Sequence, residues 1–220
     1  MTPAPLVILI SGRGSNMRAL IEASRAPQAG YRVVRVLSDK SDAGGLSIAR
    51  ELGVPAEALP AAGAADRSRY DASLRDAVLE SAPCLVALAG FMRILGASFI
   101  EALEGRLMNI HPSLLPRYKG LHTHRRVLEA GDPEHGATVH YVSEELDGGP
   151  AVLQARVQVQ PGDDEDRLSA RVQAVEHRIF PLAVSWHCTG RLCWRKGQAI
   201  LDGRRLEAPV TWNDSLKDSS

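Results

Sequence analysis

An amide and an imidazole stand two positions apart at the end of an apolar run in the middle of the chain. The run covers residues 107–111 and leads into a proline-bounded loop. Residues i and i+2 of a strand point to the same side, so Asn109 and His111 can face one cavity. An amide N–H can stabilise a developing oxyanion and an imidazole can move protons, and acyl transfer needs both. An isolated Asn-x-His is also compatible with a strand end that faces water, so other features must decide.

A glycine-rich turn, Ser-Gly-Arg-Gly-Ser-Asn at residues 11–16, directly follows a short apolar run and precedes a helical pattern. This arrangement points backbone N–H groups and a helix N-terminus at an anion. A dinucleotide fingerprint needs a third glycine where Met17 stands, and a Walker loop needs Gly-Lys-Ser/Thr, which is absent. A loop for one phosphate fits best, with Ser15 and Asn16 either capping the helix or binding phosphate oxygens. A plain strand-to-helix turn is the alternative.

Apolar residues follow another predicted strand, at residues 85–90. In open α/β sheets the loops at the C-terminal ends of strands line the ligand crevice. Met92, Ile94 and Leu95 are therefore placed either to wall a flat aromatic ligand or only to cover the next helix.

Arginines and a polar helical pair offer further contacts for a ligand. Arg67 and Arg69 can hold a carboxylate or a phosphate, although such arginines often form only a solvated helix face. Gln173 and Glu176 lie three residues apart and share a helix face.

The composition indicates an ordinary globular protein with room for one sizeable α/β domain in 220 residues. Apolar residues make up 45% and charged residues 24%, and 26 basic residues balance 26 acidic ones. This neutrality argues against a general nucleic-acid binder. The apolar run at residues 6–10 is too short to span a bilayer and lacks the flanks of a signal peptide. We therefore expect a cytoplasmic protein that contacts neither membrane nor nucleic acid.

The three cysteines do not form a recognisable framework. Cys84, Cys188 and Cys193 are an odd number without disulfide spacing, which suits a reducing compartment. His187 adjoins Cys188, but the spacing matches no zinc pattern, so we expect no metal site.

Alternating strand and helix patterns predict an α/β fold, with a mostly parallel central sheet and helices on both faces. We expect a single domain at residues 1–203 and a partly disordered C-terminal tail at residues 204–220. The predicted strands are residues 6–10, 32–37, 85–90, 107–111, 137–142 and 151–159, with a short one after Pro55. The predicted helices begin near residues 17, 44, 66, 119 and 166, residues 61–65 form a small-residue loop, and a hairpin closes the chain at residues 191–201.

Four segments together carry a family resemblance. They are residues 11–16, residues 89–95 (Ala-Gly-Phe-Met-Arg-Ile-Leu), residues 109–116 (Asn-Ile-His-Pro-Ser-Leu-Leu-Pro) and residues 145–150 (Glu-Leu-Asp-Gly-Gly-Pro). Each is weak alone, but four in family order are specific. The chain resembles the phosphoribosylglycinamide formyltransferases, folate-dependent enzymes of purine synthesis, from about Leu6 to about Gly203.

The resemblance implies a Rossmann-like formyltransferase fold with 10-formyltetrahydrofolate as co-substrate, glycinamide ribonucleotide as acceptor, and no metal. It implies a catalytic trio of Asn109, His111 and Asp147. It implies ribonucleotide contacts at Gly14, Ser15, Asn16, Gln173 and Glu176, the last at the ribose hydroxyls. It implies folate contacts at Arg67, Met92, Arg93, Ile94, Leu95, Asn109, Ser143, Glu144, Glu145, Leu146 and Asp147.

The chemistry of these residues agrees with that implication. The nucleophile is the amine of the substrate, so no activated serine or cysteine is needed. Asn109 and a protonated His111 can stabilise the oxyanion of the tetrahedral intermediate, and His111 can relay protons directly or through water. Asp147 is expected to raise the pKa of His111 by favouring the cation. Arg13 adds positive charge beside the phosphate, whereas Tyr118-Lys119 has no expected consequence.

Other functions remain as alternatives. A formyltetrahydrofolate deformylase shares the Asn, His and Asp core but passes the formyl group to water; that family has an additional N-terminal domain and lacks the run at residues 120–124. A methionyl-tRNA formyltransferase would need a C-terminal RNA-binding domain and a basic excess. A non-catalytic binder of phosphorylated metabolites would need only residues 14–16. Both a monomer and a homodimer are compatible with the sequence, because the strand at residues 151–159 can form an exposed sheet edge.

Overall fold

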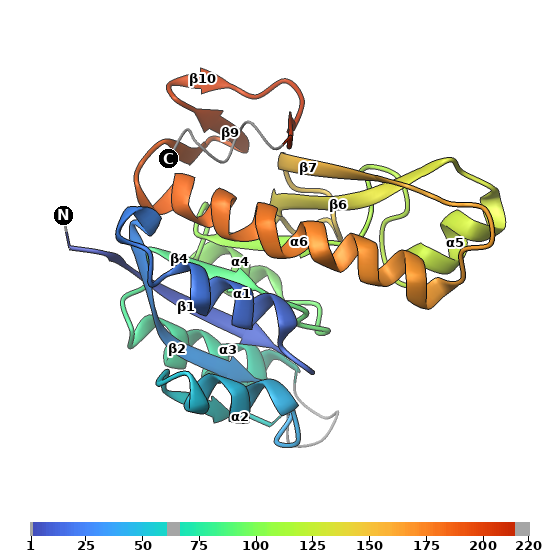
Figure 1. Cartoon of the computed structure of the whole chain (residues 1–220). Coiled ribbons are helices and arrows are strands. Elements are labelled where there is room, and N and C mark those ends of the chain that lie inside the picture. The colour runs from blue at the N-terminus through green and yellow to red at the C-terminus, as the bar shows by residue number, and fades with distance from the viewer. Residues whose placement is uncertain (1, 61–66, 214–220) are drawn as a thin grey trace.

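A computed structural model describes residues 2–60 and 67–213 of the chain (Figure 1). Its centre is an eight-stranded sheet in the order β11-β7-β6-β5-β4-β1-β2-β3. The sheet strands are β1 (Ala4–Ile10), β2 (Tyr31–Ser38), β3 (Ala56–Ala58), β4 (Leu85–Leu88), β5 (Leu107–His111), β6 (Glu134–Tyr141), β7 (Ala151–Gln158) and β11 (Val210–Thr211). The helices are α1 (Ser15–Ala23), α2 (Gly44–Glu51), α3 (Arg67–Leu79), α4 (Ala97–Ala102), α5 (Thr123–Ala130) and α6 (Glu165–Cys188), with a 3-10 turn at Pro27–Ala29.

The strands from β1 to β5 pair in parallel, and β6 is antiparallel to both of its neighbours. The predicted mostly parallel α/β architecture is thus confirmed. It follows from the apolar runs in β1 and β4, which are buried on both faces as central parallel strands require.

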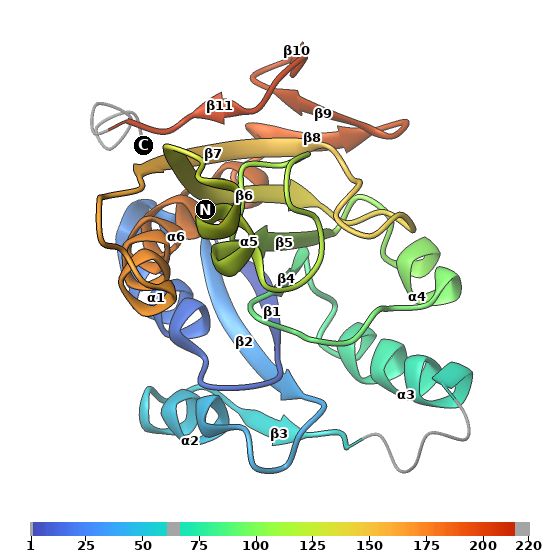
Figure 2. The same cartoon turned by 90° about the vertical axis from the view of Figure 1, so that its right-hand side faces the viewer.

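Helices cover both faces of the sheet (Figure 2). One apolar cluster joins α1, α2, α5 and α6 to one face, and a second joins α3 and α4 to the other. Within β5, Met108 and Ile110 belong to the first cluster and Leu107 to the second. Asn109 and His111 share the parity of Leu107, so both face the side of α3 and α4, as the i, i+2 spacing predicts.

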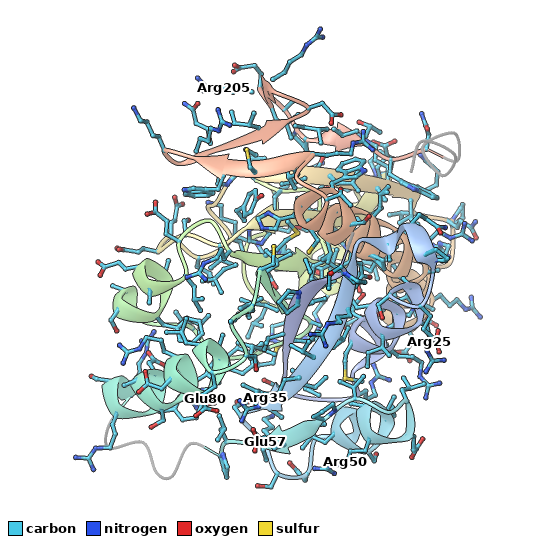
Figure 3. All side chains as sticks on the ribbon, turned by 90° about the vertical axis from the view of Figure 1, so that its left-hand side faces the viewer. Arg25, Arg35, Arg50, Glu57, Glu80 and Arg205 are labelled. Atoms are coloured by element: carbon cyan, nitrogen blue, oxygen red, sulfur yellow. The ribbon has the colours of Figure 1, made fainter. Side chains whose placement is uncertain are left out.

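Charged side chains tie the outer parallel strands together at the surface. Arg35 of β2 donates to Glu57 of β3 at 2.8 Å and to Glu80 beyond α3 at 2.9 Å (Figure 3). Both carboxylates are exposed and Arg35 is only partly buried, so this network contributes little stability compared with the apolar clusters.

The strand β7 departs partly from the alternation expected of it. Residues 152–155 are all buried, and only Arg156 and Gln158 are exposed. Gln154 is buried because its side-chain amide donates to the carbonyl oxygen of Leu115 at 2.8 Å and to Thr138 at 2.9 Å. The first half of β7 is therefore an interior strand.

Residues 204–213, which we expect to be part of a C-terminal tail, contain two short strands that pair with the rest of the protein. The predicted hairpin is confirmed as β8 (Leu192–Arg195) and β9 (Gln198–Leu201), to which β10 (Arg204–Arg205) adds. The strand β11 pairs with β7, and the backbone N–H of Trp212 donates to Gln154. Such two-residue strands carry no periodicity that a sequence could show. Residues 61–65 and 214–220, for which we expect a loop and disorder, lie outside the described residues.

No helix within the described ranges combines the length and apolar character that crossing a membrane requires.

Candidate active site

Two cavities meet at the C-terminal ends of β1, β4 and β5. The larger measures about 710 Å³ and the other about 380 Å³. Five residues line both of them: Gly90, Met92, Ile110, Pro112 and His124. A ligand in one cavity can therefore touch a ligand in the other, at the position where β5 ends.

The smaller cavity contains every residue expected to bind the ribonucleotide. Its lining includes Gly14, Ser15 and Asn16 from the glycine-rich turn, and Gln173 and Glu176 from α6. The exposed Arg13 lies at the same cavity. The structure thus brings together two segments that are about 160 residues apart in the chain.

Gly14 is required by the backbone of the turn. Its φ is +75°, in the left-handed region, and a Cβ there would lie 2.9 Å from the Cα of Gly45. Gly14 is also the N-cap of α1, without a side-chain cap. The capping alternative for Ser15 and Asn16 is therefore wrong, because these residues already lie inside the helix.

The side chains of Ser15 and Asn16 instead pair with α6. Gln173 donates to the Ser15 hydroxyl at 2.9 Å, and the Asn16 amide donates to Oε2 of Glu176 at 2.8 Å. Glu176 is buried, and this desolvation raises the pKa of its carboxyl group to about 7, against which the Asn16 hydrogen bond acts. The Oδ1 atom of Asn16 is buried and finds no hydrogen-bond partner among the described residues. A buried carboxyl group and an unsatisfied acceptor thus face one cavity, as a hydroxylated ligand would need.

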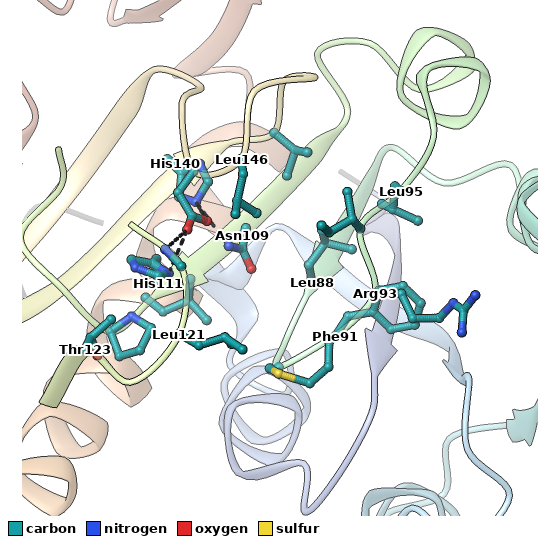
Figure 4. A pocket seen from close by; sticks show the side chains of 18 of the residues that line it. Leu88, Phe91, Arg93, Leu95, Asn109, His111, Leu121, Thr123, His140 and Leu146 are labelled. Atoms are coloured by element: carbon teal, nitrogen blue, oxygen red, sulfur yellow. Dashed lines mark hydrogen bonds and ion pairs between the residues drawn. The ribbon is translucent and has the colours of Figure 1, made fainter. Parts of the chain in front are cut away.

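At the larger cavity, a histidine from the neighbouring strand holds Asn109. Nδ1 of His140 lies 2.8 Å from the carbonyl oxygen of Tyr141, which can only accept, so Nδ1 carries the proton. Burial lowers the pKa of His140 to about 4, which keeps the ring neutral and leaves Nε2 as an acceptor. The Asn109 amide donates to this Nε2 at 3.1 Å (Figure 4). One N–H of Asn109 is therefore fixed, and the other remains available to a ligand.

His111 is held between a carbonyl oxygen and a carboxylate. Its Nε2 lies 2.9 Å from the carbonyl oxygen of Tyr118, and its Nδ1 lies 3.5 Å from Oδ2 of Asp147. The side chains of His111 and Asp147 are both 8% exposed. The second separation exceeds a normal hydrogen bond, so Nδ1 is not engaged by Asp147 and is available to an oxygen atom of a ligand in the cavity. The expected trio of Asn109, His111 and Asp147 lies around this one cavity.

Asp147 occupies an unusual backbone position. Its φ is +50°, a region that Asp tolerates better than most residues. Its Oδ2 accepts from the backbone N–H of Gly120 at 2.8 Å, and its Oδ1 lies 3.8 Å from His140. Lys119 and Glu145 form an ion pair of 2.7 Å between the same two loops. Tyr118-Lys119, for which the sequence suggests no role, therefore contributes a carbonyl contact to His111 and a link between the two loops.

The larger cavity also gathers the residues expected at the folate. Its lining includes Met92, Arg93, Ile94, Leu95, Asn109, Ser143, Glu144, Glu145, Leu146 and Asp147. Arg67 lines an adjoining cavity of about 510 Å³ and donates to the carbonyl oxygen of Ile94 at 2.7 Å. Leu88, Phe91, Leu121 and Leu146 give the space apolar walls (Figure 4). It suits a flat apolar ligand with one polar end.

Two residues that build the site escape sequence reasoning. His140 faces Asn109 because β5 and β6 pair antiparallel with Asn109 opposite His140. Ser11 accepts from the backbone N–H of Met92 at 2.8 Å and donates to Asp39 at 2.6 Å, which fixes the loop after β4. The strand-like alternation at residues 137–142 was a usable indication for His140, but only once the pairing register is known.

No group of three or more metal-ligating side chains occurs within residues 2–60 and 67–213. The polar groups of the site are instead hydrogen-bonded to one another, as the pairs of Asn109 with His140 and of Asn16 with Glu176 show.

Comparison with known proteins agrees with this architecture. The chain belongs to the formyl transferase family, whose model matches residues 4–184. Its relatives are phosphoribosylglycinamide formyltransferases: it is 51% identical to the one from Escherichia coli (strain K12) and 40% identical to the one from Haemophilus influenzae, each alignment covering 91% of this chain and 95% of the relative.

Solved structures show the same fold. The phosphoribosylglycinamide formyltransferase from Coxiella burnetii superposes with a TM-score of 0.91 at 41% identity, covering 96% of this chain and 100% of that chain. Glycinamide ribonucleotide transformylase 1 from Symbiobacterium toebii gives 0.87 at 39% identity, covering 90% and 94%. The Rossmann-like formyltransferase fold is therefore established, and the chain is a formyl-transferring enzyme of purine biosynthesis.

Proposed function

We propose that this enzyme transfers the formyl group of 10-formyltetrahydrofolate to the amine of 5'-phosphoribosylglycinamide, giving formylglycinamide ribonucleotide and tetrahydrofolate. The observation that carries the proposal is the junction of two unlike cavities at Ile110 and Pro112, directly beside Asn109 and His111. One is polar and begins at a glycine-rich turn, and the other has apolar walls. A formyl donor and a phosphorylated acceptor can therefore meet without either leaving its own cavity.

The ribonucleotide occupies the smaller cavity. Its phosphate receives backbone N–H groups at the start of α1, where the helix dipole favours an anion. Its ribose hydroxyls donate to Glu176 and to the unsatisfied Oδ1 of Asn16. Gln173 holds the Ser15 hydroxyl toward the same ligand.

The folate occupies the larger cavity. Its flat ring system lies against the apolar walls formed by Leu88, Leu95 and Leu146. The glutamate end extends toward Arg67, in the adjoining cavity, and Arg93, which stacks 4.4 Å above the Tyr70 ring. A guanidinium group pairs well with a carboxylate at such an entrance.

The reaction proceeds by direct attack of the amine on the formyl carbon. A C–N bond forms to the ribonucleotide, and the formyl oxygen becomes an oxyanion that accepts from the free N–H of Asn109 and from Nδ1–H of His111. When the intermediate collapses, the bond to the folate nitrogen breaks. The amine loses one proton and the folate nitrogen gains one, which His111 relays at Nδ1.

Asp147 and His140 support the two reacting groups: Asp147 lies beside His111, and His140 accepts a hydrogen bond from Asn109. Both ring nitrogens of His111 face oxygen acceptors, the carbonyl of Tyr118 and the carboxylate of Asp147, so each nitrogen can donate a hydrogen bond when it carries a proton. His140 keeps the Asn109 amide oriented. We therefore assign Asn109 and His111 to the reacting atoms and Asp147 to the charge of the imidazolium. The polar groups present suffice for this reaction without a metal.

A transfer assay tests the proposal. Purified protein is mixed with a 10-formyl folate and deformylation is followed spectrophotometrically, with and without the ribonucleotide. Deformylation that requires the ribonucleotide is expected. Deformylation in its absence would identify a hydrolase, and no deformylation by folded protein would leave only a binding module.

A further inference from the structure

The backbone loop that contacts His111 is held by hydrogen bonds on both sides of the contact. The carbonyl oxygen of Tyr118 lies 2.9 Å from Nε2 of His111. The Ser113 hydroxyl donates to the preceding carbonyl oxygen of the loop at 2.7 Å. Nη1 of Arg126 donates to the following carbonyl oxygen, also at 2.7 Å. Three consecutive carbonyl groups thus each face a different side chain, and the middle one faces the histidine.

The backbone of Tyr118 has a conformation that its residue type disfavours. Its φ is +55°, in the left-handed region, where a bulky side chain is uncommon. Such a backbone persists where the surrounding structure determines it. Here the Tyr118 hydroxyl donates to the carboxylate of Asp132. The guanidinium carbons of Arg117 and Arg126 lie 5.3 Å and 5.2 Å from the centre of the Tyr118 ring, within the range of a cation–π contact.

The helix α5 anchors these contacts. Arg126 belongs to α5, and Asp132 follows its C-cap, with a backbone N–H that donates to the carbonyl oxygen of Val127 at 3.3 Å. Hydrogen bonds from Arg117 and Tyr118 lower the pKa of the Asp132 carboxyl group, so this anchor is ionised at neutral pH. We call Arg117, Tyr118, Arg126 and Asp132 the Tyr118 cluster.

Two acceptors compete for the proton of a neutral His111 ring. A carbonyl oxygen can only accept a hydrogen bond, so the Tyr118 carbonyl, 2.9 Å away, favours a proton on Nε2. The carboxylate of Asp147 is the stronger acceptor and favours a proton on Nδ1, but it lies 3.5 Å away. Which tautomer prevails therefore depends on how firmly the Tyr118 carbonyl is held in place.

We propose that Tyr118 and Asp132 are positioning residues for catalysis, which fix His111 in the tautomer that carries its proton on Nε2. The tautomer follows from contacts within the protein, whereas its consequence rests on the proposed function. A bare Nδ1 can take the proton that the attacking amine loses and return it to the departing folate nitrogen. With the proton on Nδ1 instead, the nitrogen nearest Asp147 could not accept another.

The first test measures the tautomer in full-length protein labelled with nitrogen-15, without substrate. Long-range proton–nitrogen correlation spectra show which ring nitrogens carry protons, and His111→Asn identifies the signals of His111 among those of the seven histidines. From about pH 6 to about pH 9, on both sides of the ordinary histidine pKa, Nε2 of His111 should keep its proton. A neutral ring with a bare Nε2 would overturn the proposal.

This measurement is independent of the transfer assay. Formyl transfer by a protein whose His111 has a bare Nε2 would overturn the tautomer and leave the proposed function standing. A protonated Nε2 in a protein that transfers no formyl group would support the tautomer and overturn the proposed function.

The second test removes the side chain of Tyr118. Tyr118→Gly keeps the left-handed backbone accessible but releases the loop, so the neutral ring should shift to a bare Nε2 beside Asp147. The value of kcat should fall by about thirty-fold, with little change in either KM because Tyr118 lines neither cavity. A lower melting temperature with an unchanged tautomer and kcat would show a purely structural role and overturn the proposal.

The third test weakens the hydrogen bond between Tyr118 and Asp132 from either side. Tyr118→Phe and Asp132→Asn should each lower kcat by about five-fold, and the double variant should lose no more than the larger single loss, because both changes act on one contact. Asp202→Asn is the matched control, since it weakens a pair with Arg191 outside both cavities, and should change kcat less than about two-fold. Losses that multiply in the double variant would contradict a shared contact and overturn the proposal.

Discussion

The two cavities of the active site are built by different means. In the smaller one, Ser15 and Asn16 of α1 are hydrogen-bonded to Gln173 and Glu176 of α6, so the polar groups are already in place. The larger one is lined by apolar side chains that remain open to solvent, Met92, Ile94, Leu121 and Leu146, with exposed fractions of 64%, 59%, 70% and 52%. Exposed apolar groups gathered at one cavity mark a surface that a ligand covers.

Polar and apolar linings contribute to ligand binding in different ways. Preorganised polar contacts give orientation, because a misplaced ligand leaves buried groups unsatisfied. Apolar coverage gives affinity with little demand on geometry. With the substrates placed as proposed, we expect polar contacts to fix the acceptor amine in position and apolar burial to supply most of the affinity for the folate. The following predictions test that contrast, from the largest effect to the smallest.

Replacing His111 should break the chemistry where the cavities meet. His111→Asn removes a proton carrier and an oxyanion donor, so kcat should fall by about 10³-fold while either KM changes little. Steady-state kinetics measure this. His122→Asn, at the rim of the larger cavity, is the control and should lose less than about three-fold. Near-normal turnover of a folded His111→Asn would remove His111 from the mechanism.

Replacing Glu176 should affect the polar cavity alone. Glu176→Gln is expected to raise the KM for the ribonucleotide by about ten-fold, since it weakens a hydrogen bond to a charged group, and to leave the folate KM unchanged. In the unchanged protein this KM should rise as the pH falls through about 7, where the buried carboxyl group takes up its proton.

That pH dependence should vanish in Glu176→Gln. Glu22→Gln, which makes the same change on an exposed part of α1, should preserve it. A rise in the folate KM instead would mean that the two cavities are not separate.

Trimming an apolar wall should affect the larger cavity alone, and less. Leu146→Ala is expected to raise the folate KM by about five-fold through lost apolar burial, with kcat unchanged. Leu79→Ala removes a partly exposed leucine at the end of α3, outside both cavities, and serves as the comparison. Equal effects of the two variants would argue against folate contact at Leu146.

The smallest effect concerns stability and pH. Burial lowers the pKa of His135 and of His140 from 6.5 to about 4, so each unfolded histidine binds a proton that the folded one does not, and the melting temperature should fall as the pH drops from about 6.5 toward 4. Glu176, with its pKa raised from 4.5 to about 7, acts with the opposite sign in this range. Glu176→Gln should therefore steepen the loss on acidification, and a shallower loss in thermal melts would contradict this balance.

Much of the site could be predicted where one local pattern suffices. Asn109 and His111 follow from strand alternation, and the turn at residues 11–16 follows from glycine between a strand and a helix. The position of His140 could not be predicted from a local pattern, because its place beside Asn109 depends on the register of β5 against β6. The contact of His111 with the Tyr118 carbonyl could not be predicted either, because every residue has a backbone carbonyl and the sequence does not show which one faces the histidine.

The C-terminal strands show the same limit. The strand β11 has two residues and forms because β7 offers a free edge beside it.

In the proposed reaction, the formyl carbon passes directly between ligands in two adjoining cavities. We would follow carbon-13 from the formyl group of the folate in a single turnover with excess enzyme, and identify the products by mass spectrometry. We expect the label to be recovered on the amine of the ribonucleotide in one-to-one yield with tetrahydrofolate. Label recovered as free formate, with the ribonucleotide unlabelled, would contradict it.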